Sequence, residues 1–88
     1  MTFRILVHPK AAKAIAGLPK AHQRKLANLV ETLKENPVPF KRFDIKKLKG
    51  YENRFRVRLG GFRLIYEVDK KENLILLLKI EKREETYR

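Results

Sequence analysis

Apolar and polar residues alternate at the start of the chain, which predicts a strand. Between Thr2 and Val7 the apolar residues Phe3, Ile5 and Val7 share one face, as in a strand that is buried on one side. Pro9 then suits the first turn of a helix, because its missing N–H would have no partner there. His8 is expected to precede that helix rather than to act as a catalyst.

The spacing of apolar residues then changes to that of two consecutive helices. The apolar positions of each segment fall on one stripe at helical intervals: Ala11, Ala14, Ile15 and Leu18 in the first, and Leu26, Leu29, Val30 and Leu33 in the second. Residues 17–19 break the pattern, and the second helix is predicted from about Lys20 to Glu35, with His22 on its charged surface. Such a helix hairpin needs a sheet to cover its apolar stripes.

The second half of the chain has the pattern of a sheet. Candidate strands cover residues 46–48, 54–59, 62–68 and 74–80, and the continuous apolar run of the last predicts a strand buried on both faces. The order β-α-α-β-β-β-β indicates an α+β fold in which a two-helix hairpin packs on one face of a mostly antiparallel sheet of four to five strands. Residues 1–88 are expected to form a single domain.

Gly60 and Gly61 lie between two alternating segments and favour a two-residue hairpin turn. This turn predicts a register with five opposed pairs: Leu59 with Phe62, Arg58 with Arg63, Val57 with Leu64, Arg56 with Ile65, and Arg54 with Glu67. The residues that then face the helices are Phe55, Val57, Leu59, Phe62, Leu64 and Tyr66. The arginines at 54, 56, 58 and 63 all project from the opposite side of the sheet.

The charge of the chain predicts a binding partner. The formal net charge is +12, and residues 41–63 carry nine Lys and Arg against two acidic residues, so one region of the surface is expected to meet a polyanion. A charged surface of the kind found in thermophile proteins would explain the high density of charged residues, but not the concentration of basic residues in one region. Because the guanidinium group binds two phosphate oxygens at once, the arginine array favours a phosphate ligand over a merely solvated basic face.

The composition excludes several kinds of chemistry. The chain has no Cys and no Ser, and its only imidazoles are His8 and His22, so neither a serine-type triad nor a cysteine or histidine-rich zinc site can be assembled. No metal or other cofactor is therefore expected. No apolar run approaches the roughly 18 residues of a membrane span, which predicts a cytoplasmic protein without a membrane partner.

The segment FRVRLGGFRLIYEV at residues 55–68, with Leu48-Lys49-Gly50 before it and Lys82, Arg83 and Tyr87 after it, resembles the RelE toxins of prokaryotic toxin–antitoxin pairs, within the RelE/ParE superfamily. The resemblance spans essentially the whole chain. It implies a ribosome-dependent, metal-independent endoribonuclease that cleaves mRNA in the A site and so inhibits translation. It also implies a cognate RelB-like antitoxin, acidic and helical, that wraps around the toxin.

The resemblance also assigns roles to residues. The implied catalytic residues are Arg56, Arg58, Arg63, Arg83 and Tyr87, and the expected RNA-binding residues are Lys46, Lys47, Lys49, Arg54 and Lys82. In the implied reaction the 2′-OH attacks its own 3′-phosphate, Arg63 and Arg83 stabilise the developing charge, and Tyr87 stacks on or orients the nucleotide.

One departure from the family leaves the general base open. Arg56 and Arg58 stand where many relatives have lysines, and an arginine cannot plausibly accept a proton. The candidates are Lys49, Lys82, Tyr87, Glu84 or an rRNA group, and positioning with electrostatics could supply most of the rate instead.

Two other functions fit the same fold. The ParE branch of the superfamily binds DNA gyrase and performs no nuclease chemistry, although ParE-like chains generally lack the arginine set seen here. A non-catalytic RNA-binding module is the other alternative.

Overall fold

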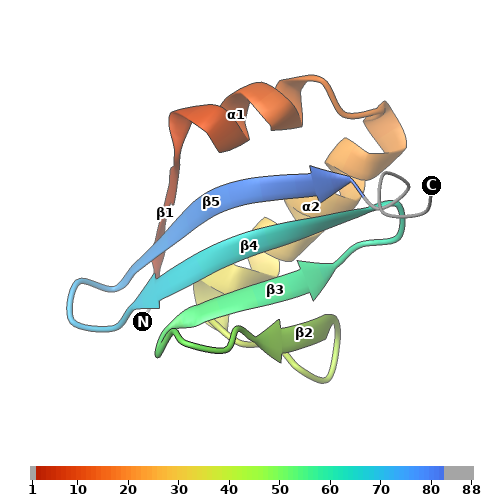
Figure 1. Ribbon diagram of the computed structural model, residues 1–88. Coiled ribbons are helices and arrows are strands. Elements are labelled where there is room, and N and C mark those ends of the chain that lie inside the picture. Colours follow the sequence, from red (N-terminus) through yellow and green to blue (C-terminus); the bar gives the residue numbers. More distant parts are fainter. Residues whose placement is uncertain (1, 83–88) are drawn as a thin grey trace.

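A five-stranded sheet with two helices behind it makes up the computed structural model, which describes residues 2–82 (Figure 1). The elements are β1 (Arg4–Val7), α1 (Pro9–Ala16), α2 (Lys20–Glu35), β2 (Asp44–Lys47), β3 (Arg54–Arg58), β4 (Phe62–Asp69) and β5 (Leu74–Lys82). The strand order is β1-β5-β4-β3-β2; β1 runs parallel to β5, and the other neighbours are antiparallel. The predicted fold class and element order are confirmed.

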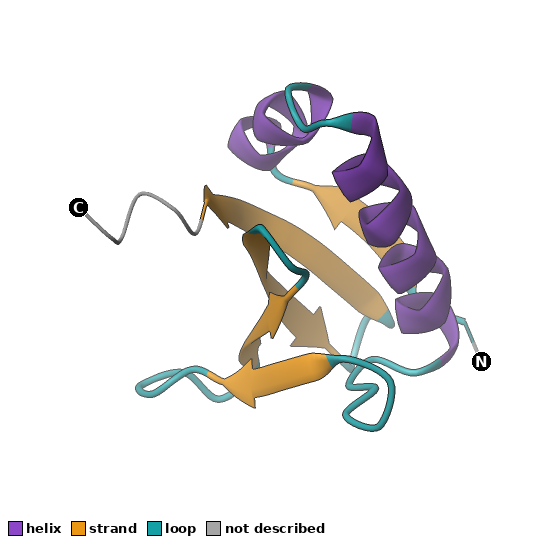
Figure 2. Cartoon of the chain, turned by 90° about the vertical axis from the view of Figure 1, so that its right-hand side faces the viewer, coloured by secondary structure: helices purple, strands orange, loops and turns teal. Residues whose placement is uncertain are grey.

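Both helices lie on one side of the sheet, as Figure 2 shows, and within residues 2–82 no helix covers the other side. Helix α1 begins where the sequence predicts, because Nδ1 of His8 accepts a hydrogen bond from the backbone N–H of Lys10 at 3.0 Å, which caps the helix. Helix α2 spans the predicted range and buries Leu26, Leu29 and Leu33 against the sheet. We refer to the uncovered side as the open face.

Alternation along β4 builds the centre of the core. Phe62, Leu64, Tyr66 and Val68 point toward the helices with at most 2% of their surface exposed. The hydroxyl of Tyr66 donates a 2.9 Å hydrogen bond to the carbonyl oxygen of Pro37, so this buried phenol is satisfied. Burial raises the pKa of the Tyr66 hydroxyl above its ordinary value.

The prediction of a strand buried on both faces at residues 74–80 is wrong. Ile75 and Leu77 are buried against the helices, but Leu74, Leu76 and Leu78 on the other side are only partly covered. The strand is central, between β1 and β4, which explains why it is so apolar. Among the described residues, however, helices cover only one of its faces.

His22 does not lie on a charged helix surface as predicted. Its ring packs on Phe62 with centroids 5.0 Å apart, and its Nε2 lies 2.8 Å from where a Cβ on Gly61 would be. The first turns of α2 therefore rest on the β3–β4 turn. Apolar periodicity could not reveal this, because the contact depends on where the turn lies beneath the helix.

Candidate nucleic-acid interface

The β3–β4 hairpin fixes the direction of the arginines, and its predicted register is confirmed. Arg54, Arg56 and Arg58 lie opposite Glu67, Ile65 and Arg63, respectively. Gly60 has a φ of +74°, a conformation that favours glycine, at the first central position of the turn, as in the type II′ turns that suit twisted hairpins. Since Val57 and Leu64 point to the helices, the arginines all project from the open face.

Four charged residues form one transverse row across the open face. Asp44 on β2 lies opposite Arg58 on β3, Arg58 opposite Arg63 on β4, and Arg63 opposite Glu81 on β5. Directly opposed side chains have Cβ atoms about 4.5–5.5 Å apart. We call this set the charged row. It places two arginines side by side with a carboxylate at each end.

The ion pairs of the charged row are loose. Arg58 Nη1 lies 3.9 Å from Asp44 Oδ2, and Arg63 Nε lies 3.8 Å from Glu81 Oε1. Both distances exceed hydrogen-bond range, so the carboxylates offset the positive charge without occupying the guanidinium donors. The arginines are therefore not locked into internal bridges.

Arg63 is the most enclosed residue of the row, with 17% of its side chain exposed. Its Nε is buried and has no hydrogen-bond partner among residues 2–82. The exposed part of the side chain must then belong to its other atoms. The sheet thus holds the stem of Arg63 in place and leaves the rest of the guanidinium group available to an acceptor.

Arg56 and Lys46 form the next row, since they lie directly opposite each other on β3 and β2. No carboxylate lies within ion-pair distance of either one in the part of the chain that the structure describes. Two unpaired cations beside the charged row extend the positive surface toward the β2 edge.

Arg54 differs from the other three arginines. Its Nε donates a 2.8 Å hydrogen bond to Glu67 Oε1, and its guanidinium carbon lies 4.4 Å from the centre of the Tyr51 ring. Both interactions are intramolecular. The cross-strand pair with Glu67 was predicted, but its consequence was not: Arg54 is already engaged within the protein.

The expected RNA-binding lysines do not share one surface. Lys46, Lys47 and Lys49 are exposed on or just after β2, but only Lys46 of the two strand residues faces the open side, opposite Arg56. Lys47 lies opposite Phe55 and Lys82 opposite Phe62, so both belong to the helix side. Lys82 lines a cavity of about 150 Å³ there, together with His22 and Gly61. The expected catalytic residues Arg83 and Tyr87, and Glu84, lie outside the described residues.

Sequence reasoning missed the two carboxylates of the charged row. Along β5 the residue opposite β4 changes from Leu77, facing Tyr66, to Lys79, facing Ile65, so Leu78 is an extra residue in a β-bulge. Strict alternation from the buried Leu77 would turn Glu81 toward the helices. The bulge reverses this and brings Glu81 beside Arg63; no signal in the sequence marks it.

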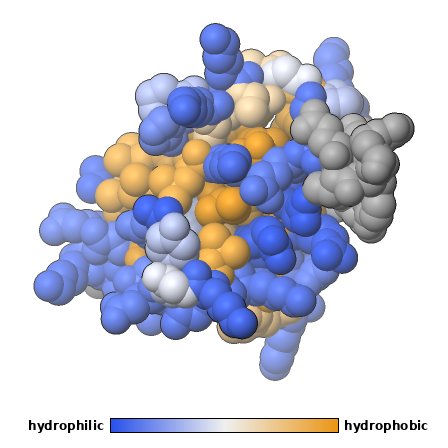
Figure 3. Space-filling model, in the orientation of Figure 1, coloured by the Kyte–Doolittle hydropathy of each residue, from blue (hydrophilic) through white to orange (hydrophobic). Residues whose placement is uncertain are grey.

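An apolar area lies beside the arginines. Figure 3 shows apolar side chains gathered in the middle of the open face with hydrophilic ones around them. By register Leu6 lies on this face, opposite Leu76, and it is 50% exposed. A cavity of about 590 Å³ opens here over Leu48, Ile65 and Leu78, with a rim formed by His8, Lys10, Tyr51, Arg54 and Lys79.

Neither a membrane segment nor a metal cluster stands out among residues 2–82. Within that range no helix is long and apolar enough to cross a bilayer, and no group of three or more His, Cys, Asp or Glu is arranged to hold a metal ion.

Two solved structures with this fold come from toxin–antitoxin complexes. RelE in the archaeal RelE–RelB complex from Pyrococcus horikoshii matches with a TM-score of 0.86 and 40% identity, over 94% of this chain and 97% of that one. RelE in the Escherichia coli RelBE complex shares the fold at a TM-score of 0.78 and 20% identity, over 91% and 95% of the two chains.

The family profile described as "ParE toxin of type II toxin-antitoxin system, parDE" matches residues 5–87, so the chain belongs to this toxin family. Within it, the chain is a RelE-type toxin. It is 41% identical over 88 residues to RelE1 of Methanocaldococcus jannaschii, which covers all of this chain and 98% of that protein.

Proposed function

We propose that this toxin is a ribosome-dependent endoribonuclease that cleaves mRNA in the A site. The observation that carries the proposal is that Arg56, Arg58 and Arg63 project from one face, with guanidinium donors that no described carboxylate occupies. Fixed guanidinium groups stabilise charge that develops on phosphate oxygens. Its site of action would be the cytoplasm, where ribosomes translate.

The reaction would use the RNA's own 2′-OH as nucleophile. Attack on the adjacent phosphorus places additional negative charge on the phosphate oxygens, and the Arg58–Arg63 pair provides positive charge across two neighbouring strands. Following the family resemblance, Arg83 would add a further cation and Tyr87 would stack on the nucleotide at the cut. Lys46, Lys47 and Lys49 would steer the phosphate backbone without reading bases.

Mapping mRNA ends after brief induction tests this function. Cuts within codons of translated messages support the nuclease function. The matched comparison is Arg63→Ala, which we expect to be inactive. If growth stops while messages stay intact, the proposed nuclease activity is wrong.

A gyrase poison is the second candidate, and the ParE description of the matching family profile favours it. A ParE-like toxin would leave translation intact and cause cleaved DNA to accumulate. The 40–41% identity to RelE proteins over nearly the whole chain favours the nuclease instead. Measuring protein synthesis and DNA breaks after the same induction separates the two.

The partner we propose is a RelB-like antitoxin, as in the RelE–RelB complex of Pyrococcus horikoshii. It should be acidic because the toxin carries a net charge of +12. The open face offers this partner apolar surface beside the arginines, since Ile65, which lines the cavity there, lies directly opposite Arg56. An antitoxin segment lying there would cover the proposed active surface directly.

A further inference from the structure

The proposed reaction needs a group that takes the proton of the 2′-OH, and the arginines cannot provide it. A guanidinium group keeps its proton at any physiological pH. A carboxylate on the open face can accept it. By register, four described acidic residues belong to that face: Asp44, Glu67, Asp69 and Glu81.

Two of these four are already engaged in hydrogen bonds. Glu67 Oε1 accepts the 2.8 Å hydrogen bond from Arg54, and Asp69 accepts one from the backbone N–H of Glu72 at 3.1 Å in the β4–β5 turn. Asp44 and Glu81 remain, at opposite ends of the charged row. With strands about 4.8 Å apart, these two residues are roughly 14 Å from each other, too far to serve one phosphate together.

Glu81 is better placed than Asp44. It is directly opposite the enclosed Arg63 on a central strand, and 29% of its side chain is exposed, against 59% for Asp44 on the edge strand β2. Its oxygens lie 3.8 Å from Arg63 Nε and 3.7 Å from Lys79 Nζ. These cations orient the carboxylate from two sides, yet both distances are too long for hydrogen bonds, so its lone pairs stay available.

We propose that Glu81 is the general base of the cleavage step, an inference that rests on the proposed nuclease function. The Glu81 carboxylate takes the proton of the 2′-OH as the 2′-oxygen forms a bond to phosphorus. The bond from phosphorus to the 5′-oxygen breaks, and that oxygen takes a proton from solvent. The products are a 2′,3′-cyclic phosphate and a 5′-OH, while Arg63 beside the base binds the charged phosphate oxygens.

The β-bulge at Leu78 fits this role. Without that extra residue, the register would place Ile80 opposite Arg63, and Glu81 would face the helices. The bulge therefore places a proton acceptor, in place of an apolar side chain, at the position next to Arg63.

Glu81→Gln tests the inference, because the amide keeps the size of the side chain but cannot accept the proton. We expect the single-turnover cleavage rate of ribosome-bound mRNA to fall about 10²–10⁴-fold, with the half-saturating toxin concentration unchanged. A general base makes the cleavage rate rise with pH, so we expect such a rise in the wild type and its loss in this variant. Glu81→Asp, which keeps a carboxylate on a shorter stem, should give an intermediate rate and retain the rise.

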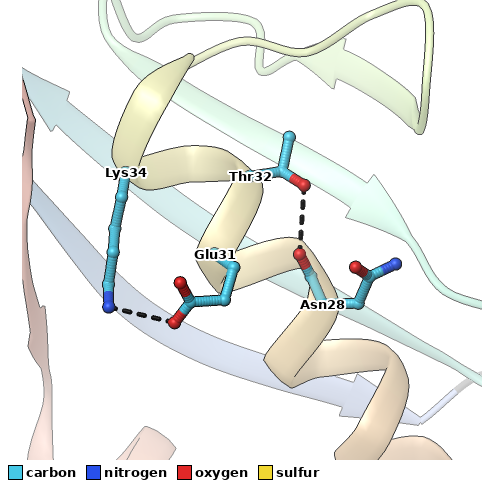
Figure 4. Close-up of polar contacts among 4 residues, drawn as sticks. All are labelled: Asn28, Glu31, Thr32 and Lys34. Atoms are coloured by element: carbon cyan, nitrogen blue, oxygen red, sulfur yellow. Dashed lines mark hydrogen bonds and ion pairs between the residues drawn. The ribbon is translucent and has the colours of Figure 1, made fainter.

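Glu31→Gln is the matched control. Glu31 lies on α2, on the other side of the sheet, and its only described ion pair is with Lys34 at 3.0 Å (Figure 4). The same charge is lost there without touching the open face, so cleavage should stay at the wild-type rate.

Two results would overturn the assignment of Glu81. One is a Glu81→Gln rate within about threefold of wild type while Arg63→Ala is inactive, which leaves the nuclease function standing without this base. The other is a loss confined to the half-saturating concentration with the pH dependence intact, which would make Glu81 a residue that only positions Arg63. A wild-type protein that leaves ribosome-bound mRNA intact removes both proposals.

Discussion

Arg58 and Arg63 lie directly opposite each other although like charges in cross-strand pairs repel by some tenths of a kcal/mol. From the sequence alone, folding gives no reason for this pair. The structure gives a partial one, because Asp44 and Glu81 flank the two arginines and offset part of the repulsion. Ion pairs this long and partly exposed contribute little, at most about 1 kcal/mol. An anionic ligand remains the stronger reason for the arrangement.

Arg63→Ala should abolish toxicity and leave the fold intact. Removing one fixed donor of an oxyanion-stabilising set lowers the rate by about 10²–10³-fold. Growth after induction and single-turnover cleavage measure the loss, and circular dichroism with antitoxin pull-down verifies the fold. Arg24→Ala, on the exposed surface of α2, is the control that removes an arginine elsewhere. Undiminished growth arrest by Arg63→Ala would rule out the catalytic role.

Tyr66→Phe should lower the free energy of unfolding at pH 7 by about 1 kcal/mol, since it removes the hydrogen bond to Pro37. Burial raises the pKa of Tyr66 in the folded state, so above about pH 10 the unfolded chain ionises this phenol while the folded chain keeps it protonated. Wild-type stability then falls with rising pH, and its advantage over the variant shrinks. Urea unfolding at pH 7 and pH 10.5 measures the free energy of unfolding of the wild type and the variant. A difference between the two proteins that is the same at both pH values contradicts the prediction.

At the scale of elements, helix α2 and the β3–β4 turn depend on each other. The Nε2 of His22 occupies the space that a Cβ on Gly61 would need, and Nζ of Lys25 lies 2.8 Å from the corresponding point on Gly60. The two glycines are thus required for different reasons. Gly61 leaves room for a side chain of α2. Gly60 also lies close to a side chain of α2, but in addition it adopts the positive φ that the turn requires.

A double-mutant cycle separates these reasons. Gly61→Ala should destabilise the wild-type protein by about 1–3 kcal/mol through overpacking, and much less in a His22→Ala background, where the obstructing ring is gone. Gly60→Ala should cost about 1 kcal/mol or more in both backgrounds, since its φ does not change. Chemical unfolding of the single and double variants measures the coupling; equal costs of Gly61→Ala in the two backgrounds would disprove the contact.

For the whole molecule, the two sides of the sheet have different tasks. The helix side buries the apolar core, and the open face presents the arginines next to exposed apolar surface. A net charge of +12 opposes compactness unless an anion binds, so a partner that covers the open face also relieves repulsion within the toxin.

Antitoxin binding should therefore weaken with salt. We expect Kd to rise roughly tenfold or more between 0.1 M and 1 M salt, as the Debye length falls from about 10 Å to 3 Å. Lys46→Gln, on the open face, should reduce this dependence, while Lys13→Gln, exposed on α1, should not. Isothermal titration calorimetry at several salt concentrations measures this dependence of Kd. A Kd that stays constant over this range would contradict an electrostatically assisted complex.

The sequence by itself determined helix α2 and the β3–β4 hairpin that carries the arginines of the open face. The 3.6-residue spacing predicted α2, and the alternation around Gly60 and Gly61 predicted the β3–β4 register and the common direction of Arg56, Arg58 and Arg63. These features follow from short-range rules, because a slip of one residue would expose the core side of each strand.

Only the tertiary structure decided what lies next to those arginines. The bulge at Leu78, the pairing of β2 with β3 and the parallel docking of β1 concern how one strand lies against another, and the alternation within a single strand does not predict them. They bring Asp44 and Glu81 to the charged row and engage the central strand β5 on both edges. The direction of the cations is therefore local information, whereas the carboxylate that can act with them is a property of the assembled sheet.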